Sequence, residues 1–187
     1  MFAAEQQYTR VAIWLHWVVA VLIVGQIIGG KIMTAMAGSP TKYEIFQLHK
    51  SFGVVILLLS LVRLGWRFTH KPPALPDGMK TYERLGARLT HVGFYVLMIV
   101  VPLSGWIVVS VSTPKISTEL FKIIPWPDVP FLTRTDGAEV LWKNVHNCLA
   151  ITVALTFFLH VGAALKHHFV NKDDVLTRMI PILKPGA

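Results

Sequence analysis

Four long apolar stretches constrain the fold of this chain more than any other feature. They cover residues 11–30, 48–66, 89–111 and 140–165. A helix needs about 20 residues to cross a hydrocarbon layer of about 30 Å, and each stretch is close to that length or longer. Segments rich in Gly and Pro separate them, such as Gly38 to Pro40 and Pro72 to Pro76, and such segments interrupt helices. The sequence therefore predicts an all-α protein, an integral membrane four-helix bundle.

The composition supports a location in lipid. Apolar residues make up 53% of the chain, charged residues make up only 15%, and the mean hydropathy is +0.55, whereas a soluble domain has about 25% charged residues. We expect a single transmembrane domain over residues 1–187, with helices near 9–33, 43–68, 83–111 and 138–170. Pro102 lies inside the third stretch, and the helix should continue past it because neighbouring helices can satisfy the freed carbonyl.

The distribution of Lys and Arg predicts the orientation in the membrane. One side of the four spans has eleven basic residues: Arg10, Arg63, Arg67, Lys71, Lys80, Arg84, Arg88, Lys166, Lys172, Arg178 and Lys184. The other side has seven: Lys31, Lys42, Lys50, Lys115, Lys122, Arg134 and Lys143. Because basic residues are enriched on the cytoplasmic side, we expect both termini to be cytoplasmic and the protein to be multi-pass in the bacterial inner membrane.

The net charge of +8 does not indicate nucleic-acid binding. The basic residues flank apolar stretches instead of forming one patch, and attraction to anionic lipid explains most of them. We therefore expect the lipid membrane as a partner and no nucleic acid. Cys148 is the only cysteine, so neither a disulfide framework nor a cysteine-based metal cluster can form.

Histidines are the residues of these stretches that point to a function. His146 and His160 are fourteen residues apart, so they share one face of a helix at a vertical separation of about 21 Å. That separation is typical of two stacked cofactors. Ionisable residues within a membrane are candidates for functional residues, although a single histidine can also be a packing residue that hydrogen-bonds between helices.

Counting from the basic residue at the end of each stretch gives the depth of each histidine. At the outer level, His49 and His146 are the two candidates for a pair. At the inner level, His160 and His16 each lie six positions from a basic residue and are expected at equal depth. His91 is shallower, but it also competes as the partner of His160, and the sequence leaves this choice open.

Two imidazoles at each level suit haem iron better than zinc. Zinc sites usually have four protein ligands close together, whereas here the imidazoles divide into two levels without an intramembrane carboxylate beside them. An iron with two axial imidazoles has no open coordination position, so it is expected to transfer electrons. A histidine-lined metal or proton transporter without haem is the alternative from another class.

Several local strings resemble one family, the bacterial di-haem cytochrome b561 proteins, over nearly the full length. The strings are Arg10 with Trp14, His16 and Trp17; His49-Lys50-Ser51 with Gly53; Arg63-Leu64-Gly65-Trp66-Arg67; His91 with Tyr95 and Pro102; and His146, His160, His167-His168 and the tail from Asp173 to Pro181. The resemblance implies two haem b groups between the first, second and fourth helices. It implies that the axial ligands are His16, His49, His146 and His160.

Within this family, the chain most resembles the superoxide oxidase type. This resemblance implies that superoxide outside the cytoplasmic membrane gives electrons to ubiquinone. Lys50 and Lys143 are then expected to attract the superoxide anion toward the outer haem. The inner rim is expected to bind the quinone or the haem propionates through four residues, namely His91, Arg88, His167 and His168. The alternative function is a cytochrome b anchor subunit that carries electrons between a periplasmic dehydrogenase or hydrogenase and the quinone pool.

Overall fold

The structure is a computed structural model that describes residues 7–183, so Lys184 of the basic tail lies outside the described residues. It contains four long helices, a two-stranded antiparallel sheet and a final π-helical turn. Their bounds are α1 Arg10–Ala35, α2 Pro40–Thr69, α3 Thr81–Val111, β1 Thr118–Leu120, β2 Ile124–Trp126, α4 Asp136–Lys166 and η1 His167–Asn171. All four helices are long and apolar enough to cross a membrane. The prediction of a four-helix membrane bundle is confirmed.

Side-chain caps fix where three of the helices begin. The hydroxyls of Thr9, Ser39 and Thr135 each accept a hydrogen bond from a backbone N–H of the first helical turn. Such caps satisfy N–H groups that have no partner within the helix. Pro40 occupies the first turn of α2, where its missing N–H is not needed. The helix α3 continues through Pro102, as the sequence analysis expected.

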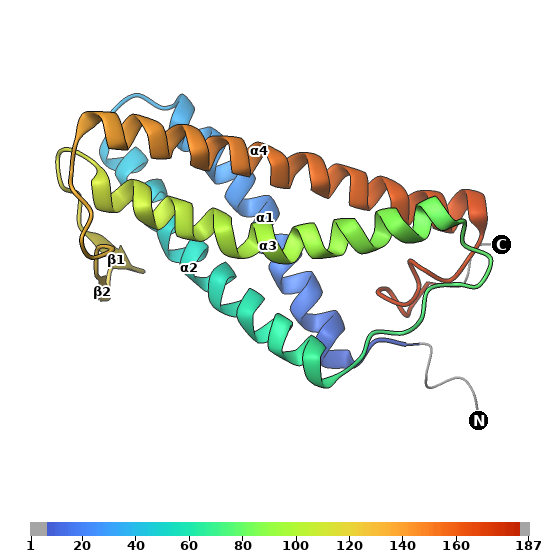
Figure 1. Cartoon of the computed structure of the whole chain (residues 1–187). Helices are drawn as coiled ribbons and strands as arrows, with labels where there is room; N and C mark the ends of the chain where they lie inside the picture. Colours follow the sequence, from blue (N-terminus) through green and yellow to red (C-terminus); the bar gives the residue numbers. More distant parts are fainter. Residues whose placement is uncertain (1–6, 184–187) are drawn as a thin grey trace.

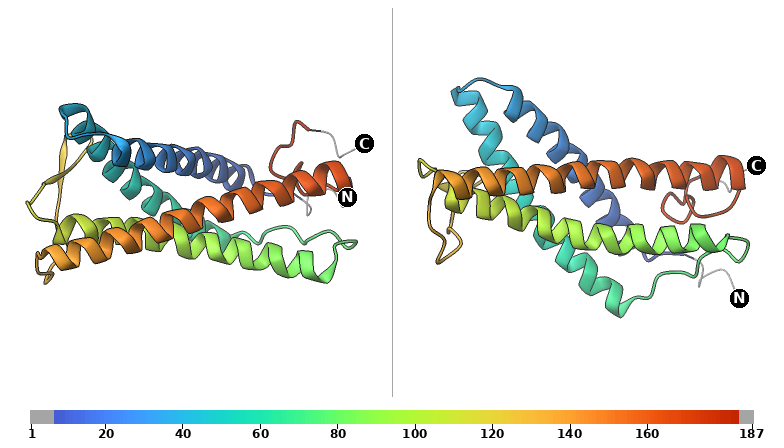
Figure 2. Two further views of the ribbon diagram at one scale, coloured as in Figure 1. Left: turned by 90° about the horizontal axis from the view of Figure 1, so that it is seen from above. Right: turned by 45° about the horizontal axis from the view of Figure 1, so that its top comes forward.

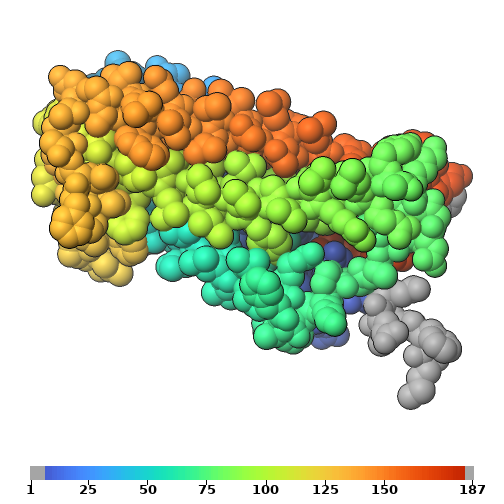
Figure 3. All heavy atoms as spheres, in the orientation of Figure 1, coloured from blue at the N-terminus to red at the C-terminus, as the bar shows by residue number. Residues whose placement is uncertain are grey.

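The four helices form two pairs that cross each other obliquely (Figures 1 and 2). Contacts are extensive between α1 and α2, between α3 and α4, and between α2 and α3. In the space-filling view, α3 and α4 cover most of α1 (Figure 3). The first and last described residues lie at one end of the bundle, which we call the terminal end, and the strands lie at the other end, which we call the hairpin end.

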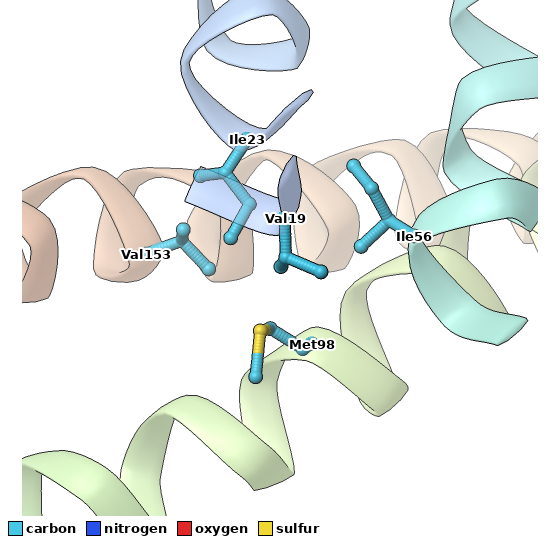
Figure 4. Packing of buried hydrophobic residues seen from close by; sticks show 5 residues of the cluster. All are labelled: Val19, Ile23, Ile56, Met98 and Val153. Carbon is cyan, nitrogen blue, oxygen red and sulfur yellow. The ribbon is translucent and has the colours of Figure 1, made fainter. Parts of the chain in front are cut away.

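An apolar layer joins the four helices near the middle of the bundle. Five buried side chains from all four helices point toward one another (Figure 4): Val19, Ile23, Ile56, Met98 and Val153. Burial of such side chains in a membrane protein gains packing contacts more than a hydrophobic driving force. This layer separates the histidines near one end of the bundle from those near the other.

The β1–β2 hairpin is fastened to the start of α2. The Gln47 side chain donates to the Ser117 carbonyl at 3.0 Å, and the backbone N–H of Phe121 donates to the Ser51 hydroxyl at 2.9 Å. The rings of Phe52 and Phe121 meet edge to face at 5.4 Å. These contacts hold the hairpin over the turn of α2 that contains His49.

The segment after η1 folds back on the terminal end. The indole N–H of Trp17 donates to the Met179 carbonyl at 2.9 Å, which ties this segment to α1. An ion pair between Lys166 and Glu83 ties the end of α4 to the start of α3. Contacts among α1, α3, α4 and the final segment therefore hold the terminal end together.

Candidate functional site

The structure brings His49 and His146 together near the hairpin end. His49 lies on α2 and His146 on α4, and their ring centroids are 6.3 Å apart at an interplanar angle of 83°. The Nδ1 atom of His49 is buried and has no hydrogen-bond partner among the described residues. We call these two residues the hairpin-end pair.

Three groups of α3 position the His146 ring. Its Nδ1 lies 2.9 Å from the Ser104 hydroxyl and 3.2 Å from the Val101 carbonyl. Because a carbonyl can only accept, we assign the ring proton to Nδ1, which leaves Nε2 with a free lone pair. This orientation is typical of metal-binding histidines, whose second nitrogen donates to a neighbouring acceptor. A Cβ atom on Gly105 would lie 3.1 Å from His146 Cε1, so any larger residue there would require the His146 ring to shift by a few tenths of an ångström.

Near the terminal end, the structure brings together three histidines from three helices. The ring centroids of His16 on α1 and His160 on α4 are 6.2 Å apart. His91 on α3 lies 5.7 Å from His160, and Phe94 contacts His160 edge to face at 5.4 Å. We call His16 and His160 the terminal-end pair. Its spacing matches that of the hairpin-end pair, whereas His91 lies closer to His160.

An arginine contacts the terminal-end pair directly. Arg63 Nη2 on α2 lies 3.0 Å from His16 Nδ1. A guanidinium can only donate, so His16 Nδ1 accepts, and the proton of the neutral ring belongs on Nε2. His16 and His146 are therefore in opposite tautomers. Arg63 and Arg67 each lie 5.7 Å from the centre of the Tyr95 ring.

Tyr8 extends this basic cluster just before α1. Burial raises the pKa of the Tyr8 phenol above its ordinary value of 10.0, although the nearby Arg67, Arg178 and Arg63 act to lower it. The phenol is therefore protonated at neutral pH, so it carries no negative charge that could neutralise the arginines. The cluster keeps its positive charge.

The spacing within each pair fits one metal ion between two imidazoles. Two metal–nitrogen bonds of about 2.0 Å, together with about 1 Å from each nitrogen to its ring centre, span roughly 6 Å. The observed separations are 6.3 and 6.2 Å. Within residues 7–183, no three His, Cys, Asp or Glu side chains gather as a metal site. The donor sets suit a metal whose remaining ligands come from a macrocycle.

The two lysines predicted near the outer pair have different surroundings. Lys50 donates to the Ser117 carbonyl at 3.1 Å and lies 4.8 Å from the centre of the Phe46 ring. No carboxylate of the described chain lies within ion-pair distance of it. Lys143, in contrast, pairs with Glu139. Lys50 therefore has no direct ion-pair partner next to His49, although the carboxylates of Glu119 and Asp128 act on it at longer range.

No hydrogen bond or ion pair of residues 7–183 joins the four residues predicted at the inner rim to one another. His91 joins the terminal-end histidines, and Arg88 is exposed without a hydrogen bond or ion pair among the described residues. His167 is buried in the π-turn, where its Nδ1 lies 2.5 Å from Asp173 Oδ2. His168 Nδ1 is buried without a described partner. A cavity of about 360 Å³ borders Asp173, and Met79, Lys80 and Glu83 also line it.

In the sequence, Arg63 and Arg67 stood out as topology charges and as parts of a family string, and Asp173 stood out only as the start of the tail string. Tyr8 and Ser104 were given no role. A signal for Arg63 was present, because it lies within an apolar stretch instead of beyond its end. An arginine at that depth needs a partner. Ser104 and Asp173 gave no comparable signal, since their contacts depend on how α3 and the final segment meet α4.

Comparison with known proteins identifies the class of this protein. Residues 7–181 match the family model described as prokaryotic cytochrome b561. The chain is 29% identical to "Cytochrome b561 homolog 2" of Escherichia coli (strain K12), an alignment that covers 94% of this chain and 92% of the relative. It is 28% identical to "Probable superoxide oxidase CybB" of Yersinia pestis, over 95% and 97% of the two chains. It is 27% identical to "Cytochrome b562" of Cereibacter sphaeroides, over 94% and 96%.

The chain belongs to the prokaryotic cytochrome b561 family. It is thus a multi-pass bacterial membrane protein of electron transfer, and family membership implies that it binds haem b. The two imidazole pairs agree with this cofactor in donor type and in spacing.

Proposed function

We propose that the protein holds two haem b groups and transfers electrons from superoxide outside the inner membrane to ubiquinone. The observation that supports this proposal is the pair of matched imidazole separations, 6.3 and 6.2 Å, near opposite ends of one bundle. The hairpin-end pair, His49 and His146, would ligate the outer haem. The terminal-end pair, His16 and His160, would ligate the inner one. A haem held by either pair would supply reversible one-electron transfer.

The overall reaction balances with two superoxide ions per quinone. Each superoxide loses one electron and leaves as O₂, while one ubiquinone gains two electrons and two protons and becomes ubiquinol. Superoxide is an anion, so the chain must attract negative charge at the hairpin end. The quinone needs protons, so the chain must hold titratable groups at the other end.

At the hairpin end, Lys50 is the residue best placed to attract superoxide. It follows His49 in the sequence, and its contact with the Ser117 carbonyl holds its ammonium group beside the hairpin. Lys143 contributes less because Glu139 balances its charge. A positive field near the reacting group raises the encounter rate of an anion, most strongly at low salt.

At the terminal end, His91 and the His167–Asp173 pair would serve the quinone. His91 lies beside the terminal-end pair, within reach of a quinone carbonyl bound there. His167 and Asp173 form a hydrogen-bonded pair at the rim, and the cavity beside Asp173 gives an entry for protons. An imidazole can accept a proton on one ring nitrogen and donate from the other, so it can relay protons to a bound quinone.

Stopped-flow mixing of the purified protein with superoxide tests this function. Haem reduction should follow mixing, and added ubiquinone should reoxidise the haem and accumulate as ubiquinol. Inclusion of superoxide dismutase in a parallel experiment should abolish the signal. A haem spectrum that does not respond to superoxide would reject superoxide as the donor and favour the anchor-subunit function, in which a periplasmic redox protein supplies the electrons.

Substitution of Lys50 tests the attraction of superoxide. Lys50→Gln should slow haem reduction by superoxide several-fold at low ionic strength, and the difference should shrink as salt is added. The matched control is the double variant Lys143→Gln/Glu139→Gln, which removes an ion pair without changing the net charge and should stay close to wild type. Equal rates for Lys50→Gln and wild type at low salt, with haem retained, would contradict the role of Lys50.

Substitution of Gly105 tests the packing around His146. Gly105→Ala places a methyl group 3.1 Å from the His146 ring, so we expect the spectrum and thermal stability of the outer haem to change. Alanine in a helix otherwise stabilises by up to about 1 kcal/mol relative to glycine. Gly86→Ala is the control, because nothing lies within 4 Å of that position. If the two variants behave alike, Gly105 does not hold the ring in place.

A further inference from the structure

Two arginines of α2 lack an acidic partner beside the terminal-end pair. Arg63 and Arg67 are one helical turn apart, and both approach the Tyr95 ring at 5.7 Å. Neither belongs to any ion pair of residues 7–183. Like charges at this spacing destabilise a helix, and a guanidinium in a low-dielectric region requires an anion. We therefore expect two negative charges to bind beside Arg63 and Arg67.

Other basic residues near this end of the bundle do have acidic partners. Arg178 pairs with Asp174 at 3.0 Å, and Lys166 pairs with Glu83. The protonated phenol of Tyr8 adds a hydrogen-bond donor and no negative charge. Arg63 and Arg67 are thus the two cations of this cluster whose charge the described chain leaves unbalanced.

The contact between Arg63 and His16 is unsuited to metal binding by His16 through Nε2. Because Arg63 donates to Nδ1, the proton of the neutral His16 ring lies on Nε2. A metal-binding histidine needs the reverse arrangement, in which Nδ1 donates to an acceptor. Arg63 must therefore release His16 before Nε2 can bind iron, and an anion close by would draw the guanidinium away.

We propose that Arg63 and Arg67 bind the two carboxylates of the inner haem, and that Arg63 leaves His16 Nδ1 when it does so. This inference rests on the proposed function, which locates a haem at the terminal-end pair. A guanidinium can bind a carboxylate with two parallel hydrogen bonds, so two arginines match the two propionates of one haem in number and charge. The same step frees His16 to take the metal-binding tautomer.

The test compares the double variant Arg63→Gln/Arg67→Gln with wild type in purified, haem-containing protein. Spectroelectrochemical titration should show a lower midpoint potential for one haem, because the loss of two positive charges disfavours the added electron. That haem should also be lost more readily during purification. The conservative variant Arg63→Lys/Arg67→Lys keeps both positive charges. Its midpoint potential for the same haem should therefore be close to that of wild type. Arg10→Gln, which removes an exposed arginine at the start of α1, should leave both potentials unchanged.

The outcomes separate this inference from the proposed function. If both haems of the double glutamine variant keep wild-type potentials and retention, the inference is wrong although the two-haem protein stands. If wild-type protein holds no haem at the terminal-end pair, the proposed function itself fails.

Glu5 is an acidic residue that lies outside the described residues, so it is a second possible source of negative charge. If Glu5→Gln weakens haem retention as much as the double variant does, that side chain balances the arginines and the inference is overturned.

Discussion

Replacement of His146 by leucine is expected to reduce the haem content of the purified protein by about half. His146 is the α4 member of the hairpin-end pair, and its ring is held by Ser104, Val101 and the space beside Gly105. Leucine has a similar volume but cannot bind iron, so the outer haem should be lost while the bundle persists. The absorption band of the remaining haem should stay, and transfer of electrons from superoxide to quinone should fall to background.

A histidine outside both pairs provides the control for this experiment. His70 is exposed after α2 and stacks on Trp66 with ring centroids 3.9 Å apart. His70→Leu should keep both haems and wild-type electron transfer. If His146→Leu keeps its full haem content, measured by pyridine haemochrome and by protein concentration, the hairpin-end pair does not bind haem.

Comparison of His16→Leu with His91→Leu should give opposite results at the terminal end. We expect His16→Leu to lose the inner haem, because the His16–His160 separation of 6.2 Å matches that of the other pair. His91 lies nearer to His160, at 5.7 Å, so His91→Leu should keep both haems and slow only the reduction of quinone. Haem content and single-turnover reoxidation by quinone distinguish these effects.

The reverse result would change the assignment of the inner ligand. The Arg63 guanidinium donates a hydrogen bond to His16 Nδ1, whereas no arginine among the described residues donates to the His91 ring. If His91→Leu loses the inner haem and His16→Leu keeps it, His91 is the partner of His160. His16 would then be a residue that Arg63 holds in place.

Much of the fold could be predicted because lipid restricts the choice of structure. A span must satisfy its backbone hydrogen bonds internally, so apolar length alone identifies four helices. Depth within the spans also indicated which histidines would come near each other. His49 and His146 are far apart in sequence, but each lies near the end of its apolar stretch that is expected on the same side of the membrane. The structure places their ring centroids 6.3 Å apart.

Contacts that depend on helix rotation were not accessible in this way. The hydrogen bond between Arg63 and His16 requires that one face of α2 turns toward α1. The position of Arg63 indicates that it needs a partner, but the sequence does not say which helix supplies that partner. The hairpin contact between Gln47 and Ser117 joins residues 70 positions apart. Neither segment alone indicates that the connection between α3 and α4 would fold over the start of α2.

The apolar layer of Val19, Ile23, Ile56, Met98 and Val153 has an electrical consequence for the proposed function. These five side chains offer no hydrogen-bonding group to a chain of water molecules, so we expect protons not to follow electrons between them. Each electron that passes inward would therefore carry uncompensated charge through the insulating part of the bilayer. An inside-negative membrane voltage would oppose that movement by about 2.3 kcal/mol per 100 mV for a full crossing. Turnover in sealed vesicles should consequently slow as the voltage builds and recover when an ionophore collapses it.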